Sequence, residues 1–119
     1  MELEAEIKKI KFQISLIGEA IRYNENPLTS LVIELDWSEE DLEAAHDCFE
    51  QAETVLNNNP QDFNNVMFEK LFKEKLGVGY QRVKAIVLAF YREHRWTSVC
   101  VAYANSFGDT RPSELMSIT

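Results

Sequence analysis

Two histidines and two cysteines are the side chains best suited to metal binding or nucleophilic chemistry. His46 and Cys48 lie two positions apart in a stretch with helical periodicity, so their side chains diverge and cannot hold one metal ion. His94 falls in an expected turn between helices, and Cys100 lies in an apolar stripe that is typical of a buried thiol. The sequence has no CxxC or HExxH pattern. We therefore predict no metal site, no cofactor and no catalytic residue.

Glycines and carboxylates offer two further kinds of chemistry. The stretch GVGY, residues 77–80, has no preceding apolar strand and no Lys-Ser/Thr, so it indicates a turn rather than a phosphate-binding loop. A pair of carboxylates for acid–base catalysis would need partial burial to separate their pKa values, and nothing in the pattern indicates that burial. An enzyme would need a site formed between subunits from residues such as His46, His94 or Tyr80, and this stays an alternative.

The net charge of −8 is unevenly distributed. Residues 23–69 contain 12 acidic residues and no lysine or arginine, whereas residues 70–95 contain seven basic and two acidic residues. One helical face in the acidic block consists of Glu39, Glu43, Asp47 and Glu50. The simplest interpretation is a solvated helix face, and the alternative is a surface that binds a basic protein partner. Direct binding of nucleic acid is not expected, because phosphate contacts need a dense basic surface.

The spacing of apolar residues predicts an all-α fold, a multihelical bundle of about five to six helices. We expect helices over residues 2–23, 27–35, 39–57, 66–76, 81–93 and 96–107. Ser38 has the type and position of an N-cap, with acidic residues in the turn that follows. Residues 28–35 and 97–104 also suit strands, and both alternatives stay open. We predict one helical domain, residues 1–107, and a flexible C-terminal tail, residues 108–119.

Cellular location is predicted from three features of the composition. The longest apolar run, residues 85–91, is far shorter than a membrane span. The first residues, MELEAEIKK, lack the apolar core of a secretory signal. Two cysteines are too few for a disulfide framework. We therefore expect a reduced, cytoplasmic protein with no membrane association.

The first expected helix has two apolar faces. Phe12, Leu16 and Tyr23 lie on one side, and a row of aliphatic residues lies on the other. The aliphatic row consists of Leu3, Ile7, Ile10, Ile14, Ile17 and Ile21. These positions fit the a and d sites of about three heptads, and isoleucine at both sites favours trimers or tetramers over dimers. We predict a homo-oligomer, most simply a trimer with a dimer or tetramer as alternatives; the other interpretation is that one chain buries both faces.

Four stretches resemble the YhaI-like family, small helical proteins of Bacillus-type bacteria with a domain of unknown function. They are IKKIKFQISLI, NPLTSLVIELDWSEEDLEAA, FEKLFKEKL and VLAFYREHRWTSVCVAYA. The resemblance covers roughly residues 5–107, and the family usually has glycine where His94 stands here. It implies an all-helical fold and self-association through the first helix. No activity is assigned to the family, so it implies no functional residue.

These patterns together favour an acidic, oligomeric interaction or regulatory protein that is not an enzyme. Small acidic helical proteins are common among bacterial and phage accessory proteins, and one such role would be to bind or inhibit a protein target. A purely structural protein without a specific ligand is a further alternative.

Overall fold

The chain forms only helices in the residues that the computed structural model describes, 2–20 and 25–119. The α-helices are α1 (Glu2–Ala20), α2 (Pro27–Glu34), α3 (Glu39–Asn58), α4 (Asn65–Leu76), α5 (Tyr80–Arg92) and α6 (Thr97–Asn105). Three short 3₁₀ helices follow α3 and α6, namely η1 (Pro60–Asp62), η2 (Gly108–Thr110) and η3 (Ser113–Leu115). The all-α prediction is confirmed, and the two segments that also suited strands are helical. The expected end of the first helix, residues 21–23, lies outside the described residues.

Side-chain caps begin two of these helices. The Asp41 N–H donates to Ser38 Oγ over 3.2 Å, and the Ser38 N–H donates to Asp41 Oδ2 over 2.9 Å, which completes a capping box at α3. At α4, the Met67 N–H donates to Asn64 Oδ1 over 2.8 Å. Gly77 ends α4 at φ 67°, in the left-handed region that glycine enters without steric cost. The caps therefore set the boundaries that the sequence pattern indicated.

An aromatic cluster centred on Phe49 of α3 forms the core. The Phe49 ring lies 4.6 Å from Phe90, 5.4 Å from Phe68 and 5.6 Å from Phe72, measured between centroids. All four side chains are fully buried, and they come from α3, α4 and α5. Edge and tilted contacts between rings add to the free energy that burial supplies. Tyr103 of α6 extends the cluster with a centroid distance of 4.9 Å to Phe68.

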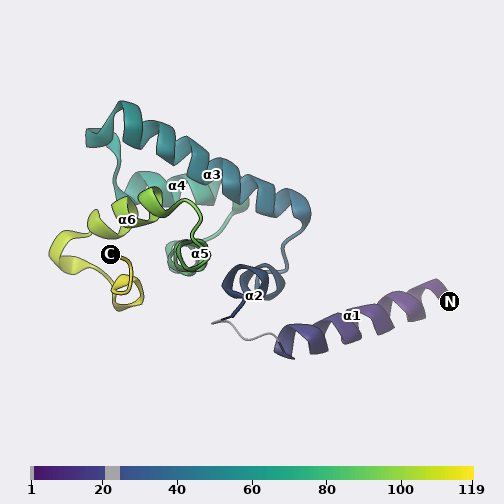
Figure 1. The fold of residues 1–119 in the computed structure, drawn as a ribbon. Coiled ribbons are helices and arrows are strands. Elements are labelled where there is room, and N and C mark those ends of the chain that lie inside the picture. Colours follow the sequence, from purple (N-terminus) through teal and green to yellow (C-terminus); the bar gives the residue numbers. More distant parts are fainter. Residues whose placement is uncertain (1, 21–24) are drawn as a thin grey trace.

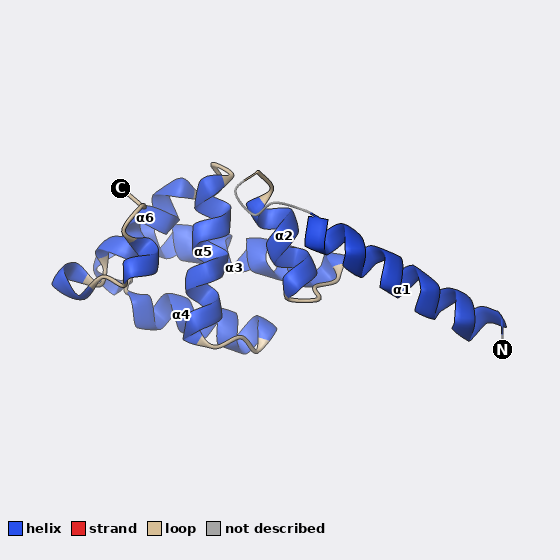
Figure 2. Ribbon diagram, turned by 90° about the horizontal axis from the view of Figure 1, so that it is seen from below, coloured by secondary structure: helices blue, strands red, loops and turns tan. Residues whose placement is uncertain are grey.

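The first helix stands apart from this core. Figure 1 looks nearly along α5, which packs against α2, α4 and α6. Figure 2 shows α1 as a rod that extends away from the other helices, with the N-terminus at its far end. The principal extents of 57 × 26 × 21 Å reflect this elongated shape. The core is therefore closed by α2 to α6 and the C-terminal segment.

The turn between α5 and α6 contains two residues in the left-handed region. His94 has φ 60° and Trp96 has φ 53°. The Arg95 N–H donates to the Phe90 carbonyl over 2.9 Å, and the His94 N–H donates to the Tyr91 carbonyl over 3.0 Å. A left-handed residue with a side chain costs about 1–2 kcal/mol, which these backbone bonds and the packing of Trp96 must offset. Glycine would suit the His94 position without that cost.

The C-terminal segment, residues 108–119, is part of the core, so the predicted domain end at residue 107 is wrong. Leu115 and Ile118 are fully buried, and η3 packs against α5. The Arg111 side chain closes this segment, since Nη1 donates to the Ile118 carbonyl over 2.8 Å and Nη2 donates to Asn105 Oδ1. The prediction of a flexible tail is wrong because two isolated apolar residues show no periodicity, yet Leu115 packs against α5 in η3 and Ile118 is buried in the same core.

We predict that Leu115→Ala and Ile118→Ala each lower the free energy of unfolding by about 2–4 kcal/mol, because each leaves a cavity in a packed core. Met116→Ala is the matched control, since Met116 lies between them and is 61% exposed. It should change the stability by less than about 0.5 kcal/mol. Urea unfolding of the three variants measures this difference, and equal small losses in all three would contradict the packing of the segment.

Candidate functional site

The aliphatic row of α1 supplies five of the ten large apolar side chains that are exposed in the described part of the chain. Ile7, Ile10 and Ile14 are 45–49% exposed, Ile17 is 59% exposed and Leu3 is 72% exposed. Ile21, the sixth predicted interface residue, lies outside the described residues. The alternative in which one chain buries both faces of this helix is therefore wrong for residues 3–17.

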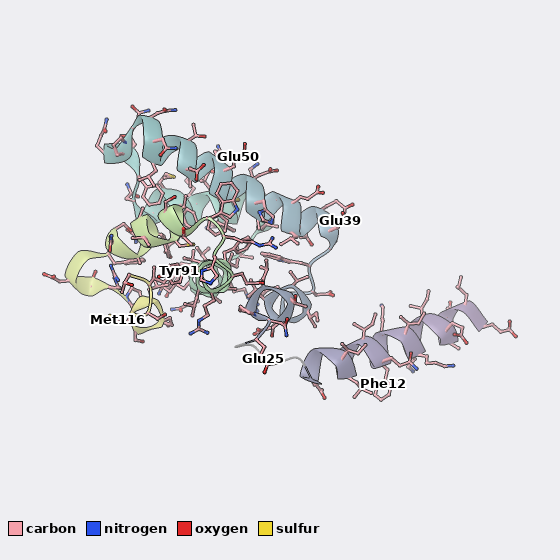
Figure 3. All side chains as sticks on the ribbon, in the orientation of Figure 1. Phe12, Glu25, Glu39, Glu50, Tyr91 and Met116 are labelled. Carbon is pink, nitrogen blue, oxygen red and sulfur yellow. The ribbon has the colours of Figure 1, made fainter. Side chains whose placement is uncertain are left out.

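The opposite face of α1 is exposed as well. Phe12 is 62% exposed and Leu16 is 47% exposed. Figure 3 shows Phe12 pointing from α1 into open space. Large exposed apolar patches on soluble proteins occur mainly at interaction surfaces, so α1 is the candidate surface for such an interaction. The row on the first face is the longer of the two, and it alone follows heptad spacing.

A close contact between Gly18 and Ile33 joins α1 to the rest of the chain. A Cβ atom on Gly18 would lie 2.8 Å from Ile33 Cγ2, a distance that real Cβ atoms do not tolerate. The absence of a side chain at Gly18 therefore lets α2 approach α1 at this point. Gly18 is the heptad e position, beside the aliphatic row and at its C-terminal end. The sequence pattern did not identify this contact; its one signal is a lone glycine in a helix of large residues.

The predicted acidic face lies on α3 as expected from its spacing. Glu39, Glu43, Asp47 and Glu50 are all exposed. Figure 3 shows Glu39 and Glu50 along the side of α3 that faces away from α5. No basic side chain forms an ion pair with these four carboxylates in the part of the chain that the structure describes. Basic side chains of the described residues therefore do not neutralise this face by direct pairing.

His46 links α3 to the strained turn before α6. The Trp96 Nε1–H donates to His46 Nδ1 over 3.0 Å, and the His46 ring meets the Phe90 ring edge-on at 5.2 Å. Trp96 also stacks on Phe49 at 6.1 Å with an interplanar angle of 11°. A neutral imidazole must accept this hydrogen bond, so His46 acts here as a structural group. The pairing of His46 with Trp96 across 50 residues has no local sequence signal.

Burial lowers the pKa of His46 from its usual value of 6.5, and Arg95 lowers it further, while Asp47 opposes the shift. A protonated imidazole would also lose its Nδ1 acceptor and with it the bond to Trp96. The folded structure therefore stabilises the neutral form of His46.

The other two residues of the enzyme alternative lie at different ends of α5. Tyr80 is 58% exposed and lines a groove of about 750 Å³ with Val66 and Val78. His94 lines a separate groove of about 740 Å³ with Arg92. Since α5 has 13 residues, about 18 Å of helix separates the two grooves. Within one chain, Tyr80 and His94 are not brought together.

The two cysteines are buried free thiols, as predicted for Cys100. Burial raises the pKa of Cys48 to about 11 and that of Cys100 to about 12. Thiolate formation near neutral pH is suppressed at both positions. Among residues 2–20 and 25–119, no cluster of three or more histidine, cysteine or acidic side chains could hold a metal ion. No helix within the same ranges is long and apolar enough to cross a membrane.

We predict that the protein loses stability as the pH falls below about 6.5, beyond the loss caused by its carboxylates. The folded-state pKa of His46 lies below the unfolded value, so the unfolded chain binds this proton first. The loss therefore begins near the unfolded pKa and is complete below the folded one. His46→Gln keeps an acceptor for Trp96 but does not titrate. Urea unfolding from about pH 7.5 to about pH 5.5 should show a steeper loss for the wild type than for this variant, and parallel curves would contradict the assignment.

Comparison of the chain with protein-family models, with curated proteins and with solved structures gave no match in any of the three. The resemblance to the YhaI-like family therefore stays a prediction that rests on the quoted stretches alone.

Proposed function

We propose that this protein is a homo-oligomeric interaction protein, not an enzyme, and that copies of the chain associate through α1. The observation that supports this most directly is the exposure of the aliphatic row in a helix that projects from a closed core. A partner with a matching aliphatic row would cover it, and a second copy of the chain has that row.

The free energy gained by burying the aliphatic row is of the same order as the cost of association. Each of the five described residues of the row retains about half or more of its surface in water. Burying the remainder is worth about 1 kcal/mol for each residue, or about 5 kcal/mol for each chain. The loss of translational and rotational freedom on association costs at least a comparable amount, about 4–15 kcal/mol. A bundle of three or four α1 helices buries more of each row than a pair of helices does, and it therefore offsets the cost of association better.

Isoleucine at both a and d sites favours three or four helices over two. We therefore propose a trimer, with a dimer or tetramer as alternatives. Of the flanking e and g positions, Glu4, Glu6, Lys11 and Gln13 are polar and exposed, which suits the wet rim of a helical bundle.

We further propose that the acidic face of α3 binds a basic protein partner. Glu39, Glu43, Asp47 and Glu50 present four exposed carboxylates on one helix, without ion pairs to basic side chains elsewhere in the described residues. A one-signed surface of this kind attracts a basic partner and accelerates encounter at low salt. This face lies on a different helix from the aliphatic row, so one surface can bind while the other holds the oligomer.

A role without catalysis accords with the positions of the three residues that an enzyme would use. His46 accepts a hydrogen bond within the fold, and Tyr80 and His94 lie in different grooves. We therefore favour a cytoplasmic regulatory or accessory protein that binds or inhibits a protein target. Its similarity to the YhaI-like family and an accessory role in bacteria or phage belong to the same proposal.

We predict that Ile10→Asp combined with Ile14→Asp converts the oligomer to single chains of 13.8 kDa, because two charges would have to be buried at the helix interface. Light scattering measures the mass. The matched control is Phe12→Asp combined with Leu16→Asp, which places the same charges on the opposite face and should leave the oligomer intact. Loss of the oligomer in the control alone would show that the other face of α1 is the interface.

We predict that reversing Glu39, Glu43 and Asp47 to lysine abolishes capture of a basic protein by the tagged chain, because attraction becomes repulsion. Capture by the wild type should also weaken as salt is raised. The control reverses three exposed acidic residues elsewhere, Asp62, Asp109 and Glu114, and should retain the captured protein. Equal capture by both triple variants would contradict a role for the α3 face.

A further inference from the structure

We propose that the α1 helices of the oligomer lie parallel and in register, and that Glu6 of one copy pairs with Lys11 of the next. This inference rests on the proposed self-association through α1 and specifies the orientation of the partner copy. It follows from the heptad positions of the charged residues, from their exposure and from the point at which α1 joins the rest of the chain.

The heptad assignment places Glu6 at a g position and Lys11 at the e position five residues later. In a parallel coiled coil, each g side chain meets the e side chain of the following heptad on the neighbouring helix. Glu6 and Lys11 therefore meet with opposite charges when the helices are in register. Every interface between neighbouring helices contains such a pair.

Both side chains are available for this contact. Glu6 and Lys11 are exposed on α1. The Glu6 carboxylate lies 3.9 Å from Lys9 Nζ, and both of these side chains are more than 60% exposed, so this intrahelical pair is weak. Lys11 has no ion pair within its own chain among the described residues.

In antiparallel arrangements, either like charges face each other or part of the aliphatic row stays uncovered. An antiparallel pair that overlaps the whole row places the two Lys11 side chains beside each other, and like charges at this distance repel. A shifted antiparallel pair can join Glu4 to Lys11, but then Ile17 has no partner across the interface. The parallel arrangement covers the row from Leu3 to Ile17 and brings opposite charges together.

The point at which α1 contacts α2 determines where the helical domains lie in the oligomer. Gly18 meets Ile33 of α2 near the C-terminal end of α1. Parallel helices therefore place the helical domains of all copies at one end of the bundle. The acidic α3 faces are then repeated around that end, which allows a basic partner with more than one site to bind several copies at once.

Disulfide cross-linking between engineered cysteines tests the orientation. Leu3→Cys and Ile17→Cys are made in separate chains, mixed under reducing conditions and then oxidised mildly. A parallel oligomer should give links between like variants, Cys at 3 to Cys at 3 and Cys at 17 to Cys at 17. Links between unlike variants should be absent. The natural cysteines are fully buried, so wild-type chains should stay unlinked. Lys8→Cys, on the outer side of the helix, is the control for random collision.

The outcomes separate this inference from the proposed self-association. Links mainly between unlike variants would show antiparallel helices and overturn the inference while leaving the oligomer in place. Unlinked variants that sediment as single chains would overturn both. Charge exchange gives a second measurement: Glu6→Lys or Lys11→Glu alone should raise the dissociation constant several-fold, and the double exchange should restore it. Failure of the double variant to recover would contradict the Glu6–Lys11 pair.

Discussion

The packing of aromatic rings around Phe49 forms a core to which α1 contributes no buried side chain. Phe68, Phe72 and Phe90 enclose Phe49, and Trp96 stacks on it, so that α3 to α6 bury one another. All described side chains that are buried in the core come from residues after position 26. In the described residues, α1 touches the domain through α2 near its C-terminal end, and the apolar side chains along its length of about 28 Å stay exposed. The elongated shape and the proposed oligomer both follow from this division.

Polar contacts inside the domain explain how its strained turn is held. Trp96 has a positive φ, and its indole donates to His46 while its ring stacks on Phe49. The Tyr103 hydroxyl donates to Glu69 Oε2 over 2.6 Å. Burial, and after it this bond, raises the pKa of Tyr103. These contacts join α6 to α3 and α4. His46 and Tyr103 therefore hold helices of the fold together. The functional surfaces that we propose are instead the exposed faces of α1 and α3.

The sequence predicted those features whose cause is local. Heptad spacing placed the aliphatic row on one face of α1, Ser38 marked the start of α3, and the glycines of residues 77–80 marked the turn after α4, because each acts on neighbouring backbone groups. The C-terminal segment was assigned wrongly, since Leu115 packs against α5 and Ile118 is buried in the core through contacts that no spacing encodes. The Gly18–Ile33 contact and the His46–Trp96 bond were missed for the same reason. The candidate surfaces were therefore predictable, whereas the contacts that position them were not.

The proposed assembly depends on copies of this chain covering the aliphatic row of α1. Sedimentation equilibrium of the intact wild-type protein, over a wide range of concentration, tests it without any substitution. Association through α1 should give a mass that rises to a fixed multiple of 13.8 kDa and persists at high salt, since the row is apolar. A mass of one chain at every concentration would contradict self-association.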